Sequence, residues 1–122
     1  MADYLPKFKP GEAVTFTVAT TDVIGGRLVV ANGVRTIAPA GADSAFVIGV
    51  AAQDAAVGAQ VGVFTRAGGV HPLVASAAIA AGAKVISAAA GKIATAGASV
   101  NHIGIALETA AADLDVIDVL FL

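Results

Sequence analysis

The sequence contains two similar segments, and this internal repeat limits the folds that the chain can adopt. Shifted by 56 positions, residues 14–42 align with residues 70–98 without a gap. Shifted by 55 positions, residues 47–61 align with residues 102–116. The identical pairs include glycines and β-branched residues, so the abundance of alanine does not account for them. Self-similarity at a fixed period is typical of a duplicated structural unit. Two copies are few for a solenoid, and a single pseudo-symmetric domain fits better.

The residue types and their alternation favour strands over helices. Val and Ile total 26 against seven Leu, and β-branched side chains fit a pleated sheet. Residues 13–20 alternate regularly, with Val14, Phe16 and Val18 on one face. Ten short strands are predicted, at residues 13–20, 27–31, 34–38, 46–52, 60–66, 70–75, 84–87, 92–95, 102–107 and 114–121. We therefore expect an all-β fold: a small β-barrel or sandwich built from two pseudo-repeated halves.

Domain organisation follows from the repeat. We expect residues 13–122 to form a single β domain, with pseudo-repeats at about 13–66 and 69–122. Residues 1–12 have no copy in the second half and are predicted to form an extended N-terminal arm. This arm carries Tyr4, Leu5, Pro6 and Phe8, and large apolar residues in an arm indicate docking on another surface. The alternative is a frayed terminus.

Three local details are predicted within the strands and turns. Asn32-Gly33 between two apolar runs predicts a tight hairpin, with residues 88–91 at the same place in the second copy. The alanine-rich segment around 76–81 allows one short helical turn at most. The alternation of the last strand breaks at Ile117, which predicts a β-bulge there.

Small residues occupy one face of two equivalent strands. Gly49 and Ala51 lie opposite the large side chains in the first copy, and Gly104 and Ala106 do so in the second. We expect another backbone or another subunit to approach these positions closely.

Motifs for catalysis and for metal or cofactor binding are scarce. The chain has no cysteine, and its one Gly-Lys pair, Gly91-Lys92, lacks the remainder of a phosphate-binding loop. His71 and His102 each stand apart from other potential ligands. The acidic residues near the C-terminus, which include Asp113, Asp115 and Asp118, alternate with apolar residues as on a strand face. We expect no enzyme activity, no cofactor and no metal site.

Charge and hydropathy argue against nucleic-acid and membrane partners. The net charge is −2, and the basic residues are scattered over both copies without interleaved aromatic residues. The N-terminus has no apolar core of a signal peptide. The longest uncharged stretch, residues 67–83, is shorter than the ~20 apolar residues of a transmembrane helix.

A family resemblance rests on a series of short motifs spread over the whole chain. In the second copy these are AAGAKVI (80–86), AAGKI (89–93) and IGIALE (103–108), followed by a closing Val-rich strand. The first copy contributes GEAVTFT (11–17) and FVIGVA (46–51). In their order and spacing these motifs resemble those of the capsid decoration proteins of tailed bacteriophages, also called cement or head-stabilising proteins.

The resemblance implies a structural virion protein. Members are β-barrel-like subunits, often trimeric, that bind the outer surface of the assembled capsid and stabilise the lattice of the major capsid protein against the pressure of packaged DNA. It therefore implies a location on the capsid exterior, after synthesis in the bacterial host cytoplasm. The arm residues Tyr4, Leu5, Pro6 and Phe8 are then the expected capsid contacts, because an extended segment can add to a sheet edge.

Other functions remain open at this stage. Another head or tail structural or assembly subunit would share the composition and differ in location and symmetry. A small ligand-binding β-barrel is the next alternative, although the chain has no Trp and a single Tyr for stacking on a ligand.

Overall fold

The computed structural model describes residues 7–9, 11–66 and 69–122 and shows an all-β protein. All ten predicted strands are present in the predicted order, and most bounds differ by one or two residues. The first half comprises β1 (Ala13–Val18), β2 (Leu28–Gly33), β3 (Thr36–Pro39), β4 (Val47–Ala51) and β5 (Gln60–Thr65). The second half comprises β6 (Val70–Val74), β7 (Lys84–Ser87), the 3₁₀ turn η1 (Ala89–Gly91), β8 (Ile93–Thr95), β9 (Gly104–Ala106) and β10 (Val116–Phe121).

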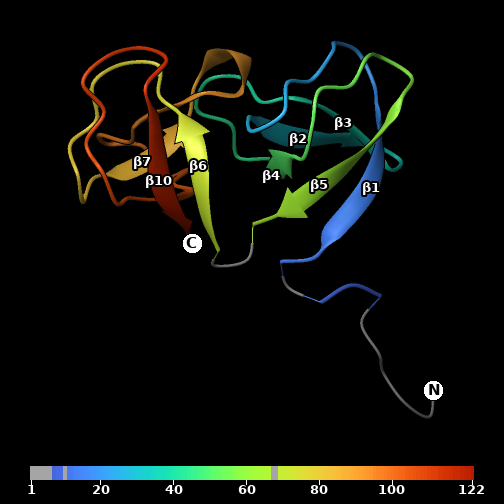
Figure 1. The fold of residues 1–122 in the computed structure, drawn as a ribbon, viewed down its shortest axis with the longest axis horizontal. Helices are drawn as coiled ribbons and strands as arrows, with labels where there is room; N and C mark the ends of the chain where they lie inside the picture. The colour runs from blue at the N-terminus through green and yellow to red at the C-terminus, as the bar shows by residue number, and fades with distance from the viewer. Residues whose placement is uncertain (1–6, 10, 67–68) are drawn as a thin grey trace.

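The two halves lie side by side and share one topology (Figure 1). The first half is a closed barrel with the strand order β1-β3-β2-β4-β5, in which β1 pairs with β3 in parallel and with β5 in antiparallel orientation. The second half is an open sheet with the order β6-β10-β9-β7-β8. When β1 to β5 are matched with β6 to β10, every neighbour in the open sheet is also a neighbour in the barrel. The sequence repeat is therefore a repeat of topology.

Each half has its own core, made of equivalent residues. One apolar cluster fills the barrel: Val18, Val23, Val29, Ile37, Ala51, Val61 and Val63. The corresponding residues of the second half belong to a larger cluster, which also contains Phe121 and Ile103. That larger cluster includes four residues of the first half, namely Leu28, Ala40, Val47 and Val50. The outside of the barrel at β2 and β4 thus packs against the core of the second half, and this contact holds the two halves together.

The small-residue positions do mark a close approach, but the approach comes from within each sheet. A Cβ atom on Gly49 would overlap with the carbonyl oxygen of Phe64 on β5. A Cβ atom on Gly104 would lie 2.5 Å from the carbonyl oxygen of Leu120 on β10. Real Cβ atoms do not come this close to a backbone oxygen, so both positions require glycine. The neighbouring strand, and not another subunit, explains these two glycines.

The predicted hairpin forms between β2 and β3, but its turn is not at Asn32-Gly33. The turn residues are Val34 and Arg35, and Arg35 has a φ of 53°. Ala31 pairs with Ile37 and Gly33 pairs with Thr36, so Asn32 is an extra residue in β2. The strand therefore continues through the Asn-Gly pair by means of a bulge.

The predicted bulge at Ile117 is wrong. Residues 116–120 of β10 pair with β6 in uninterrupted register, and Ile117, Val119 and Phe121 all point into the core. The break in alternation lies before the strand, at Leu114, whose φ is 73°. The left-handed backbone at Leu114 turns the chain into β10, and this change of direction accounts for the shift in the apolar pattern.

The segment 76–81, for which the sequence allows one short helical turn at most, forms no helical turn. Ile79 instead forms a pair of backbone hydrogen bonds with Ala110, of 3.0 and 2.9 Å. The equivalent residues of the first half, Val23 and Ala55, pair in the same way. The helical turn of the second half is η1, which connects β7 to β8 at the hairpin expected at residues 88–91. In the described residues, no helix is long and apolar enough to cross a membrane.

Candidate functional site

Only one of the four predicted capsid contacts can be placed. Tyr4, Leu5 and Pro6 lie outside the described residues. Phe8 is 44% exposed, and the guanidinium carbon of Arg35 lies 5.9 Å from the centre of its ring, which is the geometry of a cation–π contact. Phe8 therefore presents an aromatic surface beside the β2–β3 turn.

The chain enters the barrel through a turn fixed by hydrogen bonds. The Lys9 N–H donates to Oε2 of Glu12 at 3.0 Å, and the Glu12 N–H donates to the Lys9 carbonyl at 3.2 Å. The Thr65 hydroxyl donates to the Glu12 carbonyl at 3.5 Å. Residue 12 is thereby held at the end of β5, next to the start of β1.

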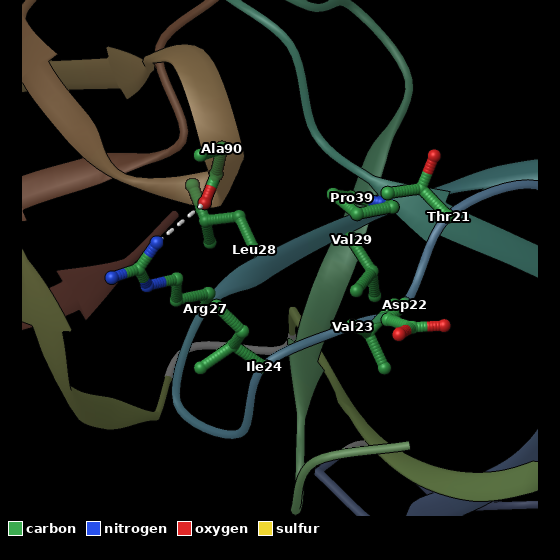
Figure 2. A pocket seen from close by; sticks show the side chains of 9 residues that line it. All are labelled: Thr21, Asp22, Val23, Ile24, Arg27, Leu28, Val29, Pro39 and Ala90. Atoms are coloured by element: carbon green, nitrogen blue, oxygen red, sulfur yellow. Dashed lines mark hydrogen bonds between the residues drawn. The ribbon is translucent and has the colours of Figure 1, made fainter. Parts of the chain in front are cut away.

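An apolar pocket of about 210 Å³ opens where the halves meet (Figure 2). Val23, Leu28, Val29 and Pro39 form much of its lining, and Ala90 of η1 closes one side. Figure 2 shows its two charged side chains, Arg27 and Asp22, on opposite sides of the pocket.

Both charged groups of this pocket serve the fold. Nη1 of Arg27 donates to the Ala90 carbonyl at 3.3 Å and so links the first half to η1. Oδ1 of Asp22 accepts from the Val57 N–H at 2.9 Å. The pocket can take an apolar group, but its lining brings no pair of acid–base groups together.

Asp113 and Asp115, near the C-terminus, each bind a different partner within the chain. Oδ2 of Asp115 accepts from the Ala111 and Ala112 N–H groups, at 2.8 and 3.1 Å. Asp113 forms an ion pair with Lys92 at 2.9 Å. Within the described part of the chain, no group of three or more metal-ligating side chains comes together. These acids order a loop and a strand end.

The two histidines lie in different surroundings. The ring centre of His71 is 5.0 Å from that of Phe121 and 6.2 Å from that of Phe64. Partial burial lowers the pKa of His71 because it disfavours the charged ring. His102 lines a second pocket, of about 220 Å³, together with Arg66. In the sequence Arg66 is one of several scattered basic residues, and no sequence motif marks this second pocket.

The strand pair β6–β10 exposes apolar side chains on its outer face. At the end of the strand pair β1–β5, Thr17 pairs with Gln60, whereas Val74 pairs with Val116 at the corresponding end of β6–β10. Val116 is 60% exposed, and Val70 at the other end of the same strand pair is 53% exposed. Exposed apolar side chains on one sheet face are available for contact with another protein.

Comparison with known proteins gives one family and one similar solved structure. The family model described as "phage cement protein" matches residues 8–121. The crystal structure of the N base of the head fiber gp8.5 in bacteriophage phi29 has a TM-score of 0.74 and 17% sequence identity. The match covers 91% of this chain and 93% of that chain, so the two share a fold. No curated protein matches the sequence.

Proposed function

The chain belongs to the phage cement protein family and is a structural protein of the phage capsid, and we propose that it binds the outer surface of the assembled head. There it stabilises the lattice of the major capsid protein against the pressure of packaged DNA. The observation that carries this proposal is the family match over residues 8–121, which includes both halves of the described fold.

The surface of the protein supports a role in protein contacts. Large apolar side chains are exposed on both halves, and among them are Phe46 at 73%, Val100 at 85% and Val116 at 60%. Few charges surround them, since 13% of the residues are charged. Such a surface fits close packing against protein neighbours in a lattice, where many weak contacts add up through avidity.

The proposed assembly has two further parts. The arm residues Tyr4, Leu5, Pro6 and Phe8 contact the capsid, and the protein acts as a homotrimer on the lattice after synthesis in the host cytoplasm. A trimer binds the lattice more tightly than a single subunit does, because its second and third contacts with the capsid form within one complex.

Co-sedimentation with phage heads that lack the protein tests the proposal. Purified protein is mixed with heads before and after lattice expansion, and bound protein is counted per major capsid protein. Saturable binding to expanded heads is expected. Failure to bind either form would contradict the proposal.

A second candidate function is the base of a head appendage. The observation that favours it is the shared fold with the N base of the phi29 head fiber. A base would occupy a defined subset of lattice positions and carry another protein outward. The number of copies bound per head in the same experiment distinguishes a base from a cement protein.

A further inference from the structure

The loops that lead into β4 and β9 meet at the surface around Arg66. These loops are equivalent in the two copies, since Ala45 precedes Gly49 by four residues and Val100 precedes Gly104 by four. Arg66 follows β5, at the end of the first half. The side chains enclose a pocket of about 220 Å³, lined by Ser44, Ala45, Arg66, Val100, Asn101 and His102. We call it the Arg66 pocket.

Arg66 is held in place but is not neutralised within the described chain. Its Nη1 donates to the Val47 carbonyl at 3.3 Å, and its Nη2 donates to the His102 carbonyl at 3.2 Å. A guanidinium group has five N–H donors, so three remain for a further acceptor. Among the described residues, the one ion pair between side chains is that of Lys92 with Asp113.

Burial makes an anion more favourable at Arg66 than at a fully exposed arginine. Loss of hydration lowers the pKa of Arg66. A carboxylate bound at Arg66 would stabilise the positive charge that has lost part of its hydration. A planar guanidinium can bind a carboxylate through two parallel hydrogen bonds.

Asp43, which directly precedes Ser44 of the lining, is already engaged. Oδ1 of Asp43 accepts from the Ser99 hydroxyl at 2.5 Å and from Nδ2 of Asn101 at 3.2 Å. These bonds join the loops of the two halves beside the pocket. Asp43 therefore positions Asn101, and the free donors of Arg66 stay available.

Apolar side chains border the charged group. Val100 is 85% exposed, and Phe46, which directly follows Ala45, is 73% exposed. The Phe46 N–H donates to Oγ of Ser44 at 3.1 Å, which fixes the backbone at this point. Arginine and aromatic residues are both enriched in the centres of protein interfaces, and here Arg66 is partly buried and Phe46 lies one residue from the lining.

We propose that the Arg66 pocket receives an aspartate or glutamate side chain of the major capsid protein. Arg66 binds the carboxylate, while Phe46 and Val100 pack around it and exclude water. The assignment to the capsid protein rests on the proposed function. The requirement for a carboxylate rests on charge complementarity with Arg66.

A purely structural role for Arg66 would also explain its two hydrogen bonds, and Arg27 offers a matched control. Arg27 likewise donates to a backbone carbonyl of the second half, that of Ala90. The variants Arg66→Gln and Arg27→Gln each remove one positive charge and one such link. They differ in location, because Arg27 lines the apolar pocket of Figure 2, to which we assign no partner.

The test measures binding of the full-length variants to expanded heads that lack the protein, at several salt concentrations. Arg66→Gln is expected to weaken binding by at least about 30-fold at low salt, as for a shielded charge pair that loses one partner. Arg27→Gln is expected to stay within about threefold of the unsubstituted protein. The salt dependence of binding should be less steep for Arg66→Gln than for Arg27→Gln.

A second variant keeps the test decisive if Arg66→Gln does not fold. Phe46→Ala removes an exposed ring and leaves the core intact, and about tenfold weaker binding is expected. Equal binding by Phe46→Ala and the unsubstituted protein would overturn the proposal in that case.

Each remaining outcome has one meaning. If the unsubstituted protein does not bind heads, the proposed function fails. If it binds and Arg66→Gln binds as tightly as Arg27→Gln, the Arg66 pocket is not the contact, and the proposed function stands. If light scattering shows that Arg66→Gln changes the oligomeric state, the carboxylate belongs to a second copy of the chain, which overturns the assignment to the capsid protein.

Discussion

The two halves share one topology, but the sheet of the first half closes into a barrel and that of the second half stays open. The barrel closes because β1 pairs with β3 over Thr17–Thr36 and Val18–Ile37. In the second half the equivalent edges, β6 and β8, meet through the single pair Ala75–Ile93. Both interiors contain equivalent residues, but that of the second half also contains Phe121, Ile103 and four residues of the first half. The exteriors differ as well, and they decide what each half can contact.

Leu28 and Lys84 show this difference at one position. Leu28 pairs with Val50, and both are buried in the core shared with the second half. Lys84 pairs with Ile105 at the equivalent place, and Lys84 is exposed. The first half therefore offers an apolar outer face that the second half covers. At the equivalent place the second half presents a charged, exposed residue.

Exchanging these two residues should have the largest effect. Leu28→Lys places an unpaired charge in the shared core, and a loss of about 4 kcal/mol or more in the free energy of unfolding is expected. Lys84→Leu should change stability by less than about 0.5 kcal/mol, because the position is exposed. Chemical denaturation measures both. Equal effects would show that the two outer faces are equivalent after all.

The paired glycines should be sensitive in both halves. Gly49→Ala and Gly104→Ala each force a Cβ atom against a strand carbonyl, and a loss of about 3 kcal/mol is expected for each. Gly41→Ala is the control, since no atom lies within 4 Å of its added Cβ and its φ is not positive. Thermal unfolding of the three variants would refute the close-approach argument if Gly41→Ala were equally harmful.

Ser87 links the halves through a buried hydroxyl, whereas the equivalent residue of the first half is Ala31. The hydroxyl donates to the Gly41 carbonyl at 2.7 Å and accepts from the Ser44 N–H at 2.9 Å. Ser87→Ala leaves both groups unpaired, and a loss of about 2 kcal/mol is expected.

Ser76→Ala is the matched control for this hydroxyl. The hydroxyl of Ser76 donates to the Ile93 carbonyl, which also accepts from the Ser76 N–H at 2.8 Å. Its removal should therefore cost less than about 0.5 kcal/mol. A loss as large as that of Ser87→Ala would contradict the assigned role of Ser87.

Leu114 occupies the place that Gly58 has in the first half, and both have a positive φ, of 73° and 86°. Gly58→Ala should cost about 1 kcal/mol, because a side chain is strained in the left-handed region. Leu114→Gly should be neutral or stabilising by up to about 0.5 kcal/mol, since relief of strain offsets the added freedom of the unfolded chain. Clear destabilisation by Leu114→Gly in denaturant titrations would show that Leu114 packs against a neighbour.

The smallest effect concerns His71, which pairs with Val119 as Val14 pairs with Val63 in the barrel, although the sequence alignment matches Val14 with Val70. Burial lowers the pKa of His71, so the unfolded chain binds the proton more tightly than the folded protein does. Its contribution to stability is therefore complete above about pH 6.5 and falls as the pH decreases below that value. His71→Val should lose less stability than the unsubstituted protein between pH 7 and pH 5. An identical pH profile for both would contradict the shift.

Much of the fold could be predicted from the sequence because the signals were local. The alternation of apolar residues and the repeated glycines predicted all ten strands. The duplication predicted a pseudo-symmetric domain, and the two halves do share one strand topology. Errors arose where backbone conformation overrode pattern. Asn32 became a bulge, and the left-handed Leu114 imitated a bulge at Ile117.

The packing of one half on the other could not be predicted. Leu28 and Val29 are adjacent on β2 and both are fully buried, which alternation on a sheet with one buried face does not allow. The Arg66 pocket depends on this packing, although the repeat alignment does show that its two loops are equivalent. Tyr4, Leu5 and Pro6 remain predicted contacts.

The temperature at which filled heads release their DNA tests the central claim most directly. Heads that lack the protein are compared with the same heads after saturation with it, and release is followed with a DNA-binding dye. A protein that stabilises the lattice raises the release temperature, in proportion to the number of sites filled. An unchanged release temperature at full occupancy would show that the protein decorates the capsid without stabilising it.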